Sequence, residues 1–149
     1  MTIENSFIGK QIGSYRITGE IASGAFGNVY LAQHSILTQR KVAIKLLHSY
    51  RGSPKEQSQF LQEAQFLETL RHRYILPLLD MGFTENMPFL IFEYAPGGSL
   101  RQRFQQLAQP LSWETARTIL VQVGEALQYA HEQHIIHRDI KPENILFNA

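Results

Sequence analysis

Three polar side chains near the end of the chain are of types that could carry out chemistry together. Asp139, Lys141 and Asn144 lie in one short stretch, and their spacing suits a loop whose two ends face the same site. Asp139 could accept a proton from a hydroxyl, Asn144 offers an amide oxygen to a hard cation such as Mg²⁺, and Lys141 is a point charge that suits a phosphate. The transfer of a phosphoryl group requires this combination of groups. The alternative interpretation is a polar turn between a helix and a strand.

A glycine-containing hairpin upstream could approach a phosphate. Residues 15–21 follow a short leader and alternate between the two faces of a half-buried strand, and residues 28–32 predict a second strand. The connecting residues 22–27 (ASGAFG) are too many and too rich in glycine for a tight turn. Glycine at positions 24 and 27 lets backbone N–H groups come close to a ligand. Hairpins that contain glycine are common, so this signal alone is weak.

Residues 41–47 (KVAIKLL) predict a third strand. Its period of two places Val42, Ile44 and Leu46 on one face. Ala43 and Lys45 then share the opposite face with Leu47. A lone lysine in a strand is usually a solvated residue at an edge, so context must decide its role.

The next segment begins with a helix-start signature. Ser53 suits the N-cap, proline follows at the first helical position, and Glu56 comes three residues after the cap. The predicted helix runs to about Leu70. Its apolar stripe consists of Phe60, Ala64, Leu67 and Leu70. Glu63 is expected on the core-facing side, where it needs a cationic partner; the alternative is a glutamate at the border of the stripe with its carboxylate in water.

The remaining segments predict two more strands and two more helices. The strands are expected at residues 75–81, where Pro77 indicates an edge or a bulge, and at residues 89–94. After a break at residues 95–99, a short polar helix is expected at residues 100–108, and Ser112 caps a long helix that ends near His134. An apolar stripe predicts the core side of this helix, formed by Ala116, Ile119, Leu120, Val123, Leu127 and Ala130. The histidines at positions 131, 134 and 137 suit a helix C-terminus better than a metal site.

Composition narrows the classes of protein and of site. The chain has 44% hydrophobic and 18% charged residues with a formal net charge of +1, so nothing indicates a nucleic-acid partner. The absence of cysteine excludes disulfides and thiolate metal sites. Residues 1–6 lack the features of a signal peptide, and no apolar run is long enough to span a bilayer. We therefore expect a cytoplasmic chain without a membrane segment in this portion.

Taken together, these motifs resemble those of eukaryotic-type serine/threonine protein kinases, in a bacterial style. Residues 137–144 (HRDIKPEN) match the catalytic loop and residues 42–45 (VAIK) match the third-strand motif. The glycine-rich pattern G-x-G-x-x-G-x-V matches at Gly24, Gly27 and Val29, with Ala22 in place of the first glycine. The resemblance implies an α+β kinase fold: an antiparallel small lobe at residues 13–94 with the αC helix, a hinge at 95–99, and at 100–149 the start of a helical large lobe, which is truncated.

The resemblance also implies roles for individual residues, with ATP, Mg²⁺ and protein substrates bearing Ser or Thr as partners. Lys45, fixed by Glu63, would hold the α- and β-phosphates, and Ala43 would pack on the adenine. The backbone of Glu93 and Ala95 would bind the adenine edge, with Phe92 behind it. The nucleotide contacts implied are Ile21, Gly24, Gly27, Val29, Ala43, Lys45, Glu63, Glu93, Ala95 and Leu146. Asp139 would orient and deprotonate the substrate hydroxyl, Lys141 would steady the γ-phosphate, and Asn144 would hold a metal ion.

The resemblance stops at residue 149, before the Asp-Phe-Gly motif whose aspartate carries the principal Mg²⁺ in this family. Two hypotheses follow. The chain is the N-terminal part of an active kinase, or it is a nucleotide-binding or interaction module without transferase activity. The intact Asp139, Lys141 and Asn144 favour the first. In either case we expect negligible activity from these 149 residues alone.

Overall fold

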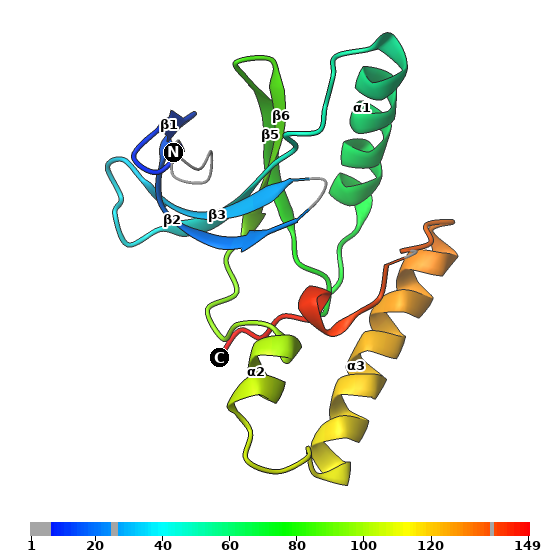
Figure 1. Ribbon diagram of the computed structural model, residues 1–149. Coiled ribbons are helices and arrows are strands. Elements are labelled where there is room, and N and C mark those ends of the chain that lie inside the picture. Colours follow the sequence, from blue (N-terminus) through cyan, green and yellow to red (C-terminus); the bar gives the residue numbers. More distant parts are fainter. Residues whose placement is uncertain (1–6, 25–26, 138) are drawn as a thin grey trace. The chain divides into compact units, whose positions relative to one another are not determined.

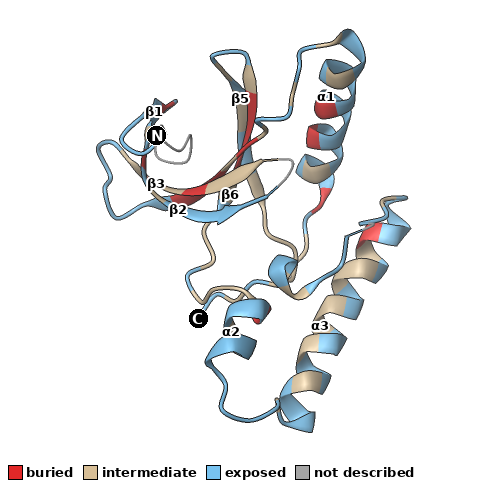
Figure 2. Ribbon diagram, in the orientation of Figure 1, coloured by how far each residue is buried: buried red, intermediate tan, exposed pale blue. Residues whose placement is uncertain are grey.

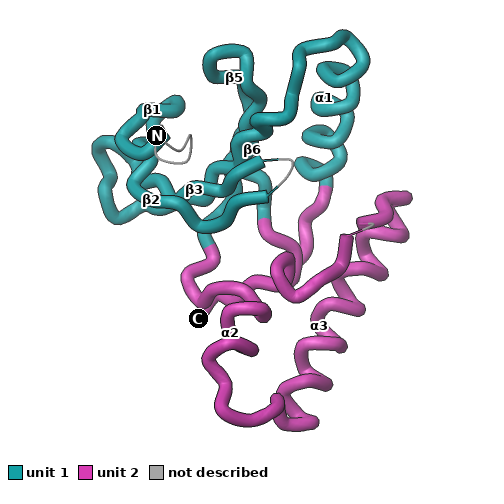
Figure 3. The backbone as a smooth tube through the Cα atoms, in the orientation of Figure 1, with its two compact units in different colours: residues 1–69, 77–94 teal, residues 70–76, 95–149 magenta. Residues whose placement is uncertain are grey.

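The computed structural model describes residues 7–24, 27–137 and 139–149 (Figure 1). The chain divides into two compact units (Figure 3). Unit 1 consists of Met1–Thr69 and Pro77–Tyr94, and unit 2 of Leu70–Leu76 and Ala95–Ala149. Residues 70–76, which fall inside the expected first lobe, therefore group with unit 2.

Unit 1 contains an antiparallel sheet with the strand order β1-β2-β3-β4-β6-β5. The strands are β1 (Gln11–Ile12), β2 (Tyr15–Ser23), β3 (Asn28–His34), β4 (Lys41–Leu46), β5 (Leu78–Thr84) and β6 (Met87–Glu93). The predicted alternation in β4 is confirmed, because Val42, Ile44 and Leu46 are buried together in the core of the unit. Strand β1 lies in the stretch that we expected to be a leader.

The prediction for the fourth long strand is wrong in its position. Strand β5 begins at Leu78, directly after Pro77, and continues to Thr84 rather than ending at Met81. Pro77 has no N–H to give to a ladder, and its carbonyl instead accepts the N–H of Glu93 at 3.1 Å. The expected edge and bulge are both present, since β5 is an outer strand with a register shift between Leu78 and Asp80.

Helix α1 (Pro54–Thr69) packs beside the sheet within unit 1 (Figure 2). Phe60 and Ala64 are buried against Leu90 of β6, as the apolar stripe predicts. The predicted helix start is also confirmed. The hydroxyl of Ser53 accepts the N–H of Glu56 at 3.2 Å and donates to its carboxylate at 3.0 Å. The other carboxylate oxygen accepts the N–H of Arg51, and this hydrogen bond holds the pKa of Glu56 below its ordinary value.

Unit 2 contains α2 (Leu100–Gln106), α3 (Trp113–Glu132) and the 3₁₀ helix η2 (Pro142–Asn144). Ser112 caps α3 as predicted, since its hydroxyl accepts the N–H of Thr115 at 3.2 Å. Residues 70–76 are held on α3. The N–H of Arg71 donates to the Tyr129 hydroxyl at 3.1 Å, and Arg73 forms an ion pair with Glu125 at 3.2 Å.

The apolar stripe of α3 is not a closed core. Of the six residues in this stripe only Ala130 is buried, and Leu120 is 67% exposed. The pattern identified the apolar side of the helix correctly, but burial also needs a second apolar surface. Within the described ranges, no helix has both the length and the apolar character needed to cross a membrane.

Candidate active site

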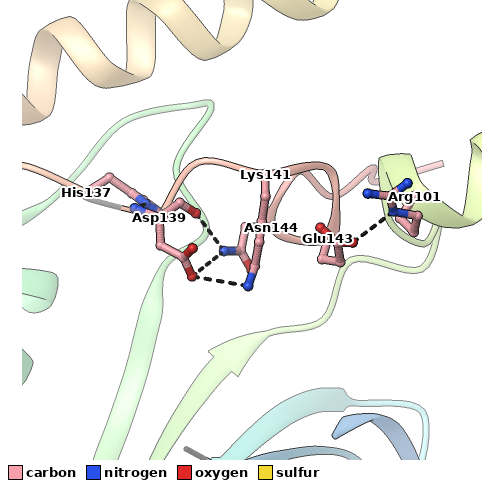
Figure 4. Close-up of polar contacts among 6 residues, drawn as sticks. All are labelled: Arg101, His137, Asp139, Lys141, Glu143 and Asn144. Atoms are coloured by element: carbon pink, nitrogen blue, oxygen red, sulfur yellow. Dashed lines mark hydrogen bonds and ion pairs between the residues drawn. The ribbon is translucent and has the colours of Figure 1, made fainter. Parts of the chain in front are cut away.

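The three predicted catalytic side chains meet in the loop that contains η2 (Figure 4). The side-chain amide of Asn144 donates to the Asp139 carbonyl at 2.9 Å and to its carboxylate at 3.3 Å. The Lys141 ammonium lies 3.4 Å from the same carboxylate oxygen of Asp139. The backbone N–H of Asp139 donates to Nδ1 of His137 at 3.1 Å. The loop therefore fixes one carboxylate between an amide and a cation. Arg138, which the catalytic-loop motif includes, lies outside the described residues.

Pairing with the start of α2 holds this loop in place. The N–H of Leu100 donates to the Ile145 carbonyl at 2.8 Å, and Leu146 forms an isolated antiparallel bridge with Ser99. One residue further, the N–H of Gly97 donates to the Phe147 carbonyl at 2.7 Å. The residues predicted as a hinge thus also form one side of a short pairing that positions Leu146.

Gly97 is glycine for a steric reason. A Cβ at this position would come within 2.6 Å of the Phe147 carbonyl oxygen and 2.7 Å of the Ala149 carbonyl oxygen. Contacts this short with backbone atoms cannot be relieved by a side-chain rotation. The glycine therefore permits the close approach of residues 147–149, which sequence reasoning had interpreted only as a break in periodicity.

An ion pair that sequence reasoning missed lies beside the catalytic residues. Arg101 of α2 contacts the Glu143 carboxylate at 2.8 Å, and both side chains are exposed by about half. The hydrogen bond from Arg101 holds the pKa of Glu143 below its ordinary value. The two residues are 42 positions apart, so no local pattern indicates their contact. The pair neutralises a carboxylate next to Asn144.

The predicted nucleotide contacts lie mainly on the strands of unit 1. Val29 is directly opposite Lys45 in the β3–β4 ladder, and Ala43 is opposite Phe92 in the β4–β6 ladder. Opposed residues of neighbouring strands share a face, so this face carries a small buried alanine beside a partly exposed lysine. That pairing of side chains suits a flat ring and an adjacent phosphate.

Our expectation for Glu63 is wrong in one respect. Glu63 is exposed rather than core-facing, and the contacts of the described residues include no ion pair between it and Lys45. The reason is helical geometry. Glu63 is rotated by about 100° from the buried Ala64, which puts its side chain on the flank of α1. The alternative interpretation, a glutamate at the border of the stripe, describes this structure.

The glycine-containing hairpin is closed by a hydrogen bond from the N–H of Gly24 to the Gly27 carbonyl at 3.0 Å. A Cβ on Gly27 would lie 2.3 Å from the Leu46 carbonyl oxygen, so this glycine is required by the approach of the hairpin to β4. His48, which the sequence did not single out, contacts the Gly24 carbonyl at 3.2 Å. Ala25 and Phe26 of the predicted loop lie outside the described residues.

The other predicted contacts are at the ends of strands. Ile21 is exposed and lies at a register irregularity of β2 between Glu20 and Ala22. Glu93 is the last residue of β6, and its N–H is already bonded to Pro77, so this donor is not available to a ligand. Ala95 is partly buried and belongs to unit 2.

The donors in the catalytic loop fit a magnesium ion. The Nδ2 group of Asn144 is used in the hydrogen bonds to Asp139, which leaves its amide oxygen as an acceptor beside the exposed carboxylate. Mg²⁺ prefers oxygen ligands and is usually bound by one or two protein groups together with phosphates and water. In the described part of the chain, no group of three His, Cys, Asp or Glu side chains could hold a metal by itself.

Comparison with known proteins agrees with this geometry. A family model described as the protein kinase domain matches residues 15–149. The chain belongs to the protein kinase family. It is 38% identical over 143 residues to the serine/threonine-protein kinase PrkC of Bacillus subtilis, covering 95% of this chain and 22% of PrkC. It is 34% identical to the kinase Pkn1 of Myxococcus xanthus, covering 95% of this chain and 20% of Pkn1.

Solved kinase structures show the same fold. The PknI kinase domain of Mycobacterium tuberculosis superposes with a TM-score of 0.79 at 26% identity, covering 93% of this chain and 57% of PknI. The predicted fold class, a truncated kinase-like α+β fold, is therefore confirmed. This kinase chain corresponds to the N-terminal part of its bacterial relatives and spans between a fifth and three fifths of the proteins that it matches.

Proposed function

We propose that this chain carries the ATP-binding elements and the catalytic loop of a serine/threonine protein kinase. The observation that carries the proposal is the arrangement of Asn144 and Lys141 around the carboxylate of Asp139. A kinase needs a base near the substrate hydroxyl, a cation near the transferred phosphoryl group and an oxygen ligand for a metal ion. Such a kinase would work in the cytoplasm, where ATP is available.

In the proposed reaction, the hydroxyl oxygen of a protein Ser or Thr attacks the γ-phosphorus of ATP in line with the leaving group. Asp139 orients this hydroxyl and accepts its proton as the new P–O bond forms and the bond to the β-phosphate oxygen breaks, which releases ADP. Lys141 contacts the γ-phosphate. Asn144 offers its amide oxygen to Mg²⁺, which would neutralise charge on the phosphate oxygens when bound.

The nucleotide is proposed to bind along the unit 1 face that carries Ala43 and Lys45. Lys45 would pair with the α- and β-phosphates, and its partly exposed position leaves it accessible to them. Glu63 is an exposed residue of α1 in this structure. For the family's ion pair with Lys45 to form, α1 or the two side chains would have to change position, so the Glu63 role remains part of the proposal.

Nucleotide binding by the 149-residue chain tests the proposal directly. Calorimetric titration with Mg-ATP should show saturable binding, and Lys45→Ala should weaken it by about tenfold or more, because a phosphate loses its charged partner. Lys41→Ala is a matched control, since Lys41 is exposed on the same strand at the opposite end. A folded chain that does not bind Mg-ATP, or equal loss in both variants, would contradict the proposal.

A phosphoryl-transfer assay separates the two hypotheses. We expect negligible transfer to a protein substrate from this chain alone. If the chain does transfer phosphate and Lys45→Ala abolishes the transfer, the non-catalytic module is excluded. If Mg-ATP binds and the parent gene encodes no further kinase segment, the binding module is the better description.

A further inference from the structure

The turn that joins β3 to β4, residues 35–40, presents two large aliphatic side chains to solvent (Figures 1 and 2). Ile36 is 83% exposed and Leu37 is 59% exposed. Single exposed apolar residues are common, but two adjacent ones at the tip of a turn are a feature that needs a reason.

Hydrogen bonds fix this turn. Nδ1 of His34 accepts the N–H of Ile36 at 3.2 Å and the N–H of Leu37 at 3.0 Å. The His34 ring packs edge-on against Tyr15, with ring centroids 5.5 Å apart. At the other end, the N–H of Arg40 donates to the Leu37 carbonyl at 2.8 Å. The two side chains are therefore held outward by a defined backbone rather than by a loose loop.

The base of the turn is tied to the neighbouring strand as well. The N–H and the hydroxyl of Ser35 both donate to the Ser14 carbonyl, at 2.9 and 3.0 Å. The Gln11 amide in turn donates to the Ser35 hydroxyl. These contacts restrain the tip from two directions, so inserting it into another phase would cost little additional ordering of the backbone.

The surroundings of the tip are basic. Between Glu20 and Glu56 the sequence has five Lys and Arg residues and no carboxylate, although the whole chain has a formal net charge of only +1. Arg40 and Lys41 are exposed directly beside the turn. Arg16 and Lys41 both oppose Gln33, on either side of it, so they lie on the exposed face of the sheet at this end.

We propose that the β3–β4 turn is a docking tip for an anionic lipid bilayer, with Ile36 and Leu37 entering the interface and Arg16, Arg40 and Lys41 contacting headgroup phosphates. Aliphatic side chains on a convex tip, ringed by flexible cations, suit a deformable interface that adapts to the protein. A protein partner would need a complementary groove. This inference does not depend on the proposed kinase activity, because its readout is binding to lipid.

Flotation of the 149-residue chain with vesicles tests the proposal. We expect binding to vesicles that contain phosphatidylglycerol, weak binding to pure phosphatidylcholine, and a decrease in affinity with added salt. The double variant Ile36→Ser/Leu37→Ser should weaken binding by about tenfold. Arg40→Gln/Lys41→Gln should weaken it to a similar extent and reduce the salt dependence.

The matched control is Leu120→Ser/Val121→Ser, which removes two adjacent exposed apolar side chains from α3. It should leave vesicle binding unchanged. If the wild-type chain does not float with anionic vesicles, or if the control loses as much binding as the tip variant, the proposal is wrong. It is also wrong if the wild-type chain is a dimer that the tip variant converts to a monomer, because the tip would then contact a second copy.

A reporter variant removes any doubt about folding. Trp113 is the single tryptophan of the chain, so Leu37→Trp in a Trp113→Phe background places the only indole at the tip. Its emission should shift to the blue with anionic vesicles and be quenched by brominated lipid chains. No shift with a folded variant would overturn the proposal.

Discussion

Unit 1 and unit 2 bury very different amounts of apolar surface. The buried hydrophobic residues of the described chain lie almost entirely in unit 1, and unit 2 contributes only Leu70, Leu100 and Ala130. In unit 2, by contrast, Trp113 is 73% exposed and Leu120 is 67% exposed. Burial of apolar area is the main favourable term in folding, so unit 1 should be the more stable.

The catalytic loop nevertheless lies in the unit with the smaller core. Its geometry depends on short-range contacts: the hydrogen bonds of Asn144, the ion pair of Arg101 with Glu143, and the pairing of Gly97 with Phe147. The chain spans 57% of the PknI kinase domain that it matches, so unit 2 corresponds to only part of what a kinase packs around this helix. A local site can therefore be well formed before its supporting core is complete.

The largest effect that the comparison predicts is on core packing. Ile44→Ala removes a fully buried side chain from the unit 1 core and should lower the free energy of unfolding by roughly 2–5 kcal/mol. Leu120→Ala in unit 2 should change it by less than about 0.5 kcal/mol. Urea unfolding followed by circular dichroism measures both. Equal losses would mean that the two units share one core.

A smaller effect is expected for the glycines of unit 1. Gly27→Ala places a Cβ 2.3 Å from a backbone oxygen and should destabilise the unit by about 1–3 kcal/mol. Gly19→Ala is the matched control, because its Cβ would meet no atom within 4 Å. It should be neutral or slightly stabilising. Thermal melts of the two variants provide the measurement, and a neutral Gly27→Ala would show that the hairpin does not approach β4 this closely.

Helix caps should separate the two units more finely. Ser53→Ala removes the cap of α1 and should lower the stability of unit 1 by about 1 kcal/mol. Ser112→Ala removes the corresponding cap of α3. Because α3 is poorly buried, we expect this change to reduce helical content without moving the unfolding midpoint of unit 1. A shift of that midpoint by Ser112→Ala would contradict the independence of the units.

The smallest effect concerns the exposed ion pair in unit 2. The pKa of Glu143 lies below 4.5 because Arg101 donates to its carboxylate. The contribution of the pair is thus present above pH 4.5 and is lost as the pH falls through the lowered pKa. In Arg101→Ala the pKa of Glu143 should rise toward its ordinary value. Carbon-detected NMR titration would measure it, and an unchanged pKa would show that the pair does not form in solution.

Features encoded by neighbouring residues could be predicted from the sequence. Asp139, Lys141 and Asn144 fall in one loop, the alternation of β4 gives its buried face, and Ser53 with Glu56 marks a helix start. Each depends on residues at most a few positions apart. The resemblance to kinases then supplied the fold class, which the comparisons confirm.

The errors have physical causes beyond local pattern. Strand β5 is displaced because its pairing with β6 is set by the tight turn at Glu85 and Asn86, both of which have positive φ. Glu63 was placed on the wrong side because an apolar stripe does not fix the direction of a long side chain at its border. Arg101 and Glu143 meet only through the pairing of distant segments, which no local spacing indicates.

Hydrogen exchange with and without Mg-ATP tests the central claim most directly, because it reports on both units and on the ligand. We predict slow exchange in β3, β4 and β6, fast exchange in α3, and added protection of β4 and residues 93–95 with Mg-ATP that Lys45→Ala abolishes. Exchange in α3 as slow as in β4, or no change with saturating Mg-ATP, would contradict the account.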